Sequence, residues 1–242
     1  MSVMSRVRDL ALLRHYSGPL RAPAFHSLTT RRRLRRELAA HADWRELLAR
    51  GRWSEQLTAE FAYYWYGAFK ARRTEVREYL EVGSWEGQSV VLAGWLFPNA
   101  HLTAVDWFNN PKAVRNFQHN TEPFKDRLTA ITGTSHQVLM SMRDGRQFDV
   151  VYLDADHAFD GTLLDTLLAW PLVRVGGFLI WDDYLWTHPD LGPLVTKPAL
   201  DAWLKTRAGF CEVVFADWQV CVRKTKPDPT LKNMAETSNV VG

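Results

Sequence analysis

The feature that most constrains the fold of this chain is the alternation of strand-type and helix-type hydrophobic patterns along its sequence. From residue 78 onward, short runs rich in β-branched and aromatic residues alternate with longer stretches of helical periodicity. Such alternation predicts an α/β fold, in which a mostly parallel sheet carries helices on both faces, as in a Rossmann-like, doubly wound domain. We expect strands at 78–82, 102–107, 128–132, 148–153 and 177–181, and helices near 87–96, 112–120, 135–142, 160–172 and 197–206.

Two further β-type runs close this pattern. They lie at 212–215 and 219–223 with a tight turn at Ala216-Asp217, which predicts a C-terminal antiparallel hairpin. Cys211 and Cys221 are the two cysteines of the chain and could face each other across this hairpin. A reducing compartment disfavours a disulfide between them, and their spacing is not that of metal ligands.

Helical patterns fill the first 75 residues. We expect one helix over 31–49, capped by Thr30, and an aromatic-rich helix over 60–73 that packs against the main domain, walls a substrate pocket, or does both. The chain then divides into an N-terminal helical extension (1–75), a main α/β domain (76–224) and a polar tail (225–242) that we expect to be flexible.

Charge and hydropathy favour an ordinary globular protein. Hydrophobic residues make up 46% and charged residues 24%, and no apolar run approaches the roughly 20 residues that span a bilayer. The first 20 residues are too broken for a secretory signal, so we expect a cytoplasmic location. The net charge is +3, and the arginine-rich run at 31–36 could bind nucleic-acid phosphates or form a solvated helix face. We favour the solvated face, because no aromatic-basic motif accompanies the run.

The first three strands end in residues that suit a nucleoside-containing cofactor. The stretch EVGSWEGQS at 81–89 is a glycine-containing turn that brings backbone N–H groups close to a ligand. Trp85 stands where a dinucleotide-binding turn needs its second glycine, which argues against a pyrophosphate cofactor. Asp106 lies 19 residues beyond Gly87, and we favour a ribose-binding role for it over that of a turn aspartate. Ser135-His136 could equally cap a helix or bond an adenine edge.

Acidic residues follow the fourth and fifth strands. Asp154 would lie beside Asp182 and Asp183 at neighbouring strand ends, where three carboxylates repel one another unless a cation neutralises them. We favour Mg²⁺ as that cation over a set of helix caps. His157 is either a general base for a bound hydroxyl or a surface histidine, and Asp156 is the alternative base.

Together these segments resemble class I S-adenosylmethionine-dependent methyltransferases over residues 79–224. The closer similarity is to metal-dependent O-methyltransferases of the catechol, caffeoyl-CoA and macrocin types. The 81–89 stretch matches the catechol-type first motif, which implies Gly83 and Ser89 near the methionine part of the cofactor and Trp85 near its sulfonium. Asp154-x-x-His157 is similar to the macrocin-type metal ligand plus base, whereas catechol-type enzymes have lysine at the position of His157.

This resemblance implies two sets of site residues. We expect S-adenosylmethionine to bind through Glu81, Gly83, Ser84, Trp85, Gly87, Ser89, Asp106, Trp107, Ser135 and His136. We expect Mg²⁺ to bind through Asp154, Asp182 and Asp183, with Asp154 and His157 as the catalytic residues.

The activity implied is Mg²⁺-assisted O-methylation of a small-molecule hydroxyl, on a sugar diol, a catechol or another natural product. Neither nucleic acid nor a membrane is an expected partner, and the aromatic N-terminal helices are candidates for a homo-oligomer contact. Two alternatives stay open. One is a metal-independent methyltransferase, and the other is a non-catalytic module of the same fold with a basic N-terminal arm.

Overall fold

The computed structural model describes residues 27–54, 57–142 and 146–229. The first 20 residues, which we expected to belong to the helical extension, and most of the predicted tail lie outside these ranges. None of the helices within them is long and apolar enough to cross a membrane.

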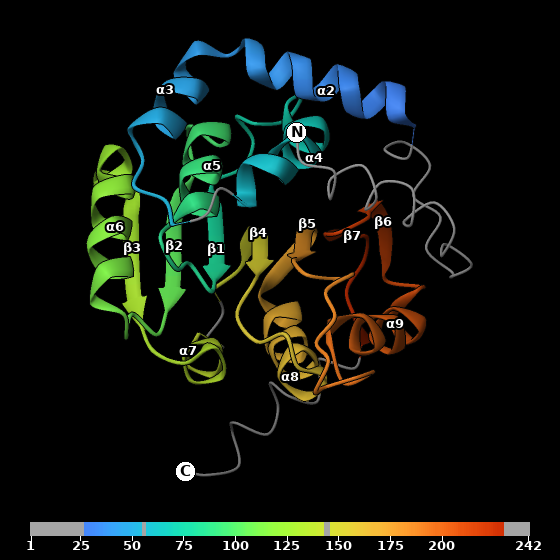
Figure 1. Cartoon of the computed structure of the whole chain (residues 1–242). Helices are drawn as coiled ribbons and strands as arrows, with labels where there is room; N and C mark the ends of the chain where they lie inside the picture. The colour runs from blue at the N-terminus through green and yellow to red at the C-terminus, as the bar shows by residue number, and fades with distance from the viewer. Residues whose placement is uncertain (1–26, 55–56, 143–145, 230–242) are drawn as a thin grey trace.

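A seven-stranded sheet with the order β3-β2-β1-β4-β5-β7-β6 forms the centre of the molecule (Figure 1). The first five strands pair in parallel, and β7 is antiparallel to both β5 and β6. This topology confirms the predicted Rossmann-like sheet with an antiparallel C-terminal pair. The strands are β1 (Glu78–Val82), β2 (His101–Asp106), β3 (Leu128–Thr132), β4 (Phe148–Leu153), β5 (Val173–Trp181), β6 (Cys211–Ala216) and β7 (Val220–Lys224).

Helices cover both faces of this sheet, because side chains of its central strands alternate between two buried clusters. Tyr79 and Tyr152 lie in one cluster, whereas their neighbours Leu80 and Val151 lie in the other. The first cluster includes α2 (Leu28–Ala40), α4 (Leu57–Phe69), α5 (Gln88–Leu96) and α6 (Pro111–Thr121), and the second includes α7 (Ser135–Ser141), α8 (Phe159–Ala169) and α9 (Thr196–Arg207). Short 3₁₀ helices, η1 (Glu122–Arg127) and η2 (Trp170–Leu172), precede β3 and β5.

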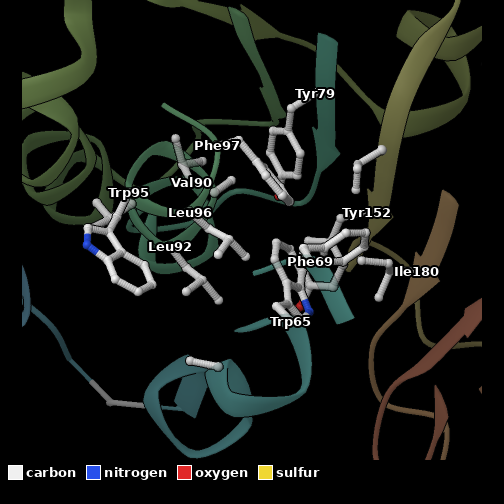
Figure 2. Packing of buried hydrophobic residues seen from close by; sticks show 14 of the residues in the cluster. Trp65, Phe69, Tyr79, Val90, Leu92, Trp95, Leu96, Phe97, Tyr152 and Ile180 are labelled. Atoms are coloured by element: carbon white, nitrogen blue, oxygen red, sulfur yellow. The ribbon is translucent and has the colours of Figure 1, made fainter. Parts of the chain in front are cut away.

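The N-terminal helices share a core with the sheet. Figure 2 shows Trp65 and Phe69 of α4 beside Tyr152 and Ile180 of the central strands, with residues of α5 completing the cluster. The Trp65 and Tyr152 rings meet edge to face, with centroids 5.0 Å apart. The helical extension is therefore packed into the domain through its aromatic side chains.

The helix expected over 31–49 is two helices, so that prediction is wrong. Helix α2 begins after Ser27, whose hydroxyl accepts a hydrogen bond from the Thr30 backbone N–H, and it ends at extended His41. Helix α3 (Ala42–Arg50) starts there in a new direction. The break seats the His41 ring against Trp95 of α5, with centroids 5.2 Å apart. Helix α4 ends at Phe69, short of the expected 73, and residues 70–75 continue as turns.

The two cysteines do not face each other across the C-terminal hairpin, contrary to the expectation. The register pairs Cys211 with Lys224 and Cys221 with Phe215. Cys221 lies three residues before Lys224, the partner of Cys211, so the two thiols do not oppose each other, and both are free.

Candidate active site

The residues expected to form the site follow strands that end at one edge of the sheet. In Figure 1 the arrowheads of β1, β2, β3 and β4 point to the same edge. The register places Val82 beside both Val105 and Leu153, and Leu153 beside Trp181. The turn after β1, Asp106 at the end of β2 and the acids after β4 and β5 are therefore neighbours, as the parallel topology requires.

Gly83 joins the turn after β1 to the acidic end of β4. Its φ is +94°, and a Cβ atom built on it would lie 2.0 Å from the backbone oxygen of Asp154. Backbone hydrogen bonds fix this approach on both sides, from Gly83 to Val105 at 2.8 Å and from Asp154 to Val82 at 2.8 Å. Only glycine fits here, and its close approach brings the first cofactor segment against the first acid of the expected metal site.

The remainder of this turn is organised around the carboxylate of Asp106. Its two oxygens accept backbone hydrogen bonds, one from Trp85 at 2.8 Å and one from Phe108 at 2.7 Å. Both donors have positive φ, so the carboxylate holds two strained turns together. Trp85 and Trp107 are 49% and 64% exposed beside it. Asp106 is thus a turn aspartate by its contacts, and each oxygen keeps a further lone pair for a ligand hydroxyl.

Glu81 lies beneath the turn and is fully buried. Its carboxylate accepts hydrogen bonds from Ser89 at 2.7 Å and from the Tyr79 hydroxyl. Burial raises the pKa of Glu81 to about 7, while the hydroxyl donors pull it back down. Gly87, with a φ of +81°, starts α5, and the buried Ser84 hydroxyl reaches the Val105 carbonyl. The buried contacts of Glu81, Ser84 and Ser89 therefore fix the conformation of the turn from beneath.

Ser135 and His136 lie at the start of α7 and point to different surroundings. The Ser135 hydroxyl bonds Asp165 of α8, whose pKa burial raises to about 6 against the opposing effect of that hydrogen bond. His136 is exposed. Ser135 is thus engaged by α8, while His136 is open to solvent, and their part in binding an adenine edge stays a prediction.

The acidic residues at the ends of β4 and β5 converge. The Tyr152 hydroxyl bridges two of them, donating to Asp182 and lying 3.2 Å from Asp154. Burial raises the pKa of Asp154 well above its usual range, and repulsion from Asp182 and Asp183 adds to the effect. Burial likewise raises the pKa of Asp182, with repulsion from Asp183 next in size. Negative charge concentrated in this way is what a divalent cation would relieve.

Among the described residues, one group of possible ligand atoms lies within 4.8 Å of one another, and it consists of Asp154, His157 and Asp183. Nδ1 of His157 is 3.5 Å from Asp183. Two carboxylates and an imidazole are a donor set that suits a divalent cation, so the residues present fit the metal.

Asp182 has a different position from the other two expected ligands. Its Oδ2 accepts hydrogen bonds from Tyr152 and, at 3.1 Å, from Gln219, and its Oδ1 accepts one from the Asp183 backbone at 2.7 Å. It adjoins the group of ligand atoms with both oxygens engaged. The structure thus adds His157 to the group of potential ligands, where the sequence suggested a base.

Asp183 and Asp156 differ in what holds them. Asp183 has a φ of +55°, and its Oδ1 accepts a hydrogen bond from the Trp218 indole at 2.9 Å. Asp156 is exposed and accepts a hydrogen bond from the Ala158 backbone N–H before the start of α8, which is the contact of a turn residue.

A small pocket beside the cluster is lined by residues that include Asp154, His157, Asp165 and Asp182.

Three residues that touch the acids were not anticipated as site residues. Tyr152, Trp218 and Gln219 each donate a hydrogen bond to an aspartate of the cluster. Tyr152 and Gln219 belonged to predicted strands and Trp218 followed the predicted turn, so local pattern carried no signal for these long-range contacts.

Comparison with protein families matches residues 80–184 to a methyltransferase domain. In sequence, the chain is 26% identical over 134 residues to the uncharacterized protein R132 of Acanthamoeba polyphaga mimivirus. That match covers 51% of this chain and 59% of the viral protein, so the chain spans less than two thirds of that relative.

Solved structures share the fold at low sequence identity. A Staphylococcus aureus protein, provisionally assigned as a caffeoyl-CoA O-methyltransferase, superposes with a TM-score of 0.59 at 16% identity, over 83% of this chain and all of its own. MycE, a methyltransferase of the mycinamycin biosynthetic pathway in complex with Mg and S-adenosylhomocysteine, gives 0.56 at 17%, over 72% of this chain and 52% of its own. The methyltransferase PaMTH1 of Podospora anserina, bound to S-adenosylhomocysteine, gives 0.55 at 15%, over 93% and 97%.

Proposed function

We propose that the chain is a metal-assisted O-methyltransferase, on the premise that it has the fold of class I S-adenosylmethionine-dependent methyltransferases and that residues 80–184 match a methyltransferase domain. The proposed acceptor is a small molecule with adjacent oxygens, such as a catechol or a sugar diol. The observation that carries the proposal is the grouping of Asp154, His157 and Asp183 within 4.8 Å at the sheet edge that also bears the glycine turn.

On the donor side, the turn at 83–89 and Asp106 would hold S-adenosylmethionine, which supplies an electrophilic methyl group. The exposed Trp85 offers a flat apolar surface at the mouth of the turn. Asp106 is held in place by two backbone donors, and its remaining lone pairs would accept hydrogen bonds from the ribose hydroxyls. The contact between Gly83 and Asp154 links donor and acceptor sides, which favours the alignment that methyl transfer needs.

On the acceptor side, Asp154 and Asp183 would hold a divalent cation such as Mg²⁺, with Asp182 beside them. When bound, the cation would lower the pKa of a coordinated acceptor hydroxyl. His157 would accept the hydroxyl proton: Asp183 lies nearest its Nδ1, which leaves Nε2 as the atom for proton transfer. MycE is the comparison structure with both Mg and S-adenosylhomocysteine, and it supports this arrangement by fold alone.

Contacts of the arginine-rich run support a small-molecule acceptor over a nucleic acid. Arg31 pairs with Asp217, and Arg35 lies over the Tyr63 ring at 4.5 Å. Arg33 pairs with Glu37. These arginines are thus engaged within the protein, which supports the interpretation of the run as a packed and solvated helix face.

A methyl-transfer assay tests the proposal. Purified chain is incubated with S-adenosylmethionine and a panel of catechols and sugar diols, with and without EDTA, and S-adenosylhomocysteine release is measured. We expect activity on at least one vicinal diol, its loss in EDTA and its recovery with Mg²⁺. Turnover that EDTA leaves unchanged would support the metal-independent alternative. An absence of S-adenosylhomocysteine binding by calorimetry would refute the cofactor assignment itself.

A further inference from the structure

The turn that joins β6 to β7, residues 217–219, reaches both aspartates that follow β5. The Trp218 indole donates to Asp183 at 2.9 Å, and the Gln219 amide donates to Asp182 at 3.1 Å. The Trp218 carbonyl also accepts a hydrogen bond from the Tyr184 backbone at 2.8 Å, which fixes the turn against the segment that carries the acids. Adjacent residues of one turn thus hold adjacent carboxylates.

Helix α4 contacts the same turn from the opposite side, through residues spaced three and four apart on one helix face. Trp65 donates its indole N–H to Gln219 Oε1 at 2.9 Å, and the Tyr64 hydroxyl donates to Asp217 at 2.6 Å. The Phe61 ring stacks with Trp218 at 6.1 Å, the two planes 9° apart. This is the face that an α-helix presents at i, i+3 and i+4.

The bond from Trp65 decides which way the Gln219 amide points. An indole N–H can only donate, so the amide must present its oxygen to Trp65 and its NH₂ group to the other side. On that side lies Asp182, an acceptor. Both Trp65 and Gln219 are almost fully buried, at 1% and 2% exposed, so water does not supply an alternative donor cheaply. Without the indole N–H, the buried amide oxygen would lose its donor, and the amide would no longer be held in this orientation from the α4 side.

We propose that Gln219, oriented by Trp65 of α4, is a positioning residue for cation binding. It holds Asp182, whose other oxygen accepts the Asp183 backbone N–H, and so fixes the place of Asp183. The N-terminal helical extension is then part of the acidic site, since one of its side chains sets the donor that faces the acids. This inference rests on the metal part of the proposed function. It concerns contacts behind potential ligands, where loss of a partner typically weakens cation affinity by about 10- to 100-fold.

The test measures the affinity of the full-length chain for Mn²⁺ by calorimetry, in matched variants of α4. Trp65→Phe removes the indole N–H and keeps an aromatic ring, and we expect it to weaken Mn²⁺ binding by about tenfold. Tyr64→Phe is the control, because it removes a hydrogen bond to the same turn without touching Gln219, and we expect less than about a twofold change. Gln219→Leu removes the other partner of the bond and should match Trp65→Phe.

The double variant Trp65→Phe, Gln219→Leu separates positioning from packing. If Trp65 acts through Gln219, the second substitution adds no further loss of Mn²⁺ affinity. Additive losses, or equal affinities of Trp65→Phe and the wild type, would overturn the inference. S-adenosylhomocysteine affinity confirms that each variant is folded, and if Trp65→Phe does not fold, Gln219→Leu against Tyr64→Phe decides. A wild type that binds S-adenosylhomocysteine but no Mn²⁺ would overturn both this inference and the metal part of the proposed function, while leaving methyl transfer open.

Discussion

A Gly83→Ala substitution should disturb stability and both halves of the site through one methyl group. An L-residue forced to the φ of +94° found here costs about 1–2 kcal/mol. The added Cβ would also lie 2.0 Å from the Asp154 backbone oxygen, where real contacts stay beyond 3.0 Å. The tips of β1 and β4 would have to separate, at an overpacking cost of about 1–3 kcal/mol. We therefore expect a loss of about 2–5 kcal/mol in the free energy of unfolding.

Substitutions at two other glycines separate the conformational cost from the overpacking cost. Gly192 has a φ of +53°, and no atom lies within 4 Å of the position that an added Cβ would take, so Gly192→Ala should cost about 1–2 kcal/mol from conformation alone. Gly209 has neither constraint, and Gly209→Ala should be neutral or slightly stabilising. Urea denaturation of the three variants gives the comparison, and calorimetry with S-adenosylhomocysteine reports the turn itself. A Gly83→Ala variant no less stable than Gly192→Ala would refute the tight contact between the strand tips.

Three further perturbations probe polar side chains at or beneath the site. Glu81→Gln removes a carboxyl group whose pKa is about 7 in the folded protein, above its usual 4.5. The protonated carboxyl contributes its full stability to the wild type below pH 4.5, and this contribution is lost as the pH rises through 7. The stability of the variant relative to wild type should hence improve by on the order of 3 kcal/mol between pH 4 and pH 8 in chelator, and a constant difference across that range would argue against the raised pKa. Tyr152→Phe removes the hydroxyl that Asp154 and Asp182 share. The free energy of unfolding should fall by about 1–3 kcal/mol, and the affinity for Mn²⁺ should weaken. An unchanged Mn²⁺ titration would contradict the bridging role of this hydroxyl. His157→Ala should lower kcat by about 10²–10⁴ with little change in KM if the imidazole is the base, whereas loss of Mn²⁺ affinity would identify it as a ligand.

Much of the sheet could be predicted because each parallel strand has a recognisable local sequence pattern. The strands at 78–82, 128–132 and 148–153 coincide with the predicted ranges, since each is a short apolar run bounded by turn residues. A parallel sheet places the carboxyl ends of its strands at one edge, so the turn after β1 and the acids after β4 and β5 could be expected at that edge. The convergence expected of those strand ends is what the register shows.

What could not be predicted depends on contacts between distant residues. The break at His41 accompanies a contact with Trp95, which is distant in the sequence, and the offset between the two cysteines is set by how β6 pairs with β7. Nothing near Gln219 in the sequence reveals that its partners are Trp65 and Asp182. The roles of individual site residues stay predictions, but the structure shows that Asp154 and Asp183 group with His157.

The place of β7 in the sheet bears on the order in which this protein can be built. β7 lies between β5 and β6, although β6 precedes it along the chain. During synthesis, the open edge of β5 therefore stays without a partner until residues 220–224 have left the ribosome, and β6 has no neighbour in the sheet before then. The acidic edge of β5 is finished last, although the glycine turn after β1 is made more than a hundred residues earlier. A nascent chain can thus form the glycine turn well before Trp218 and Gln219 reach the acids that follow β5.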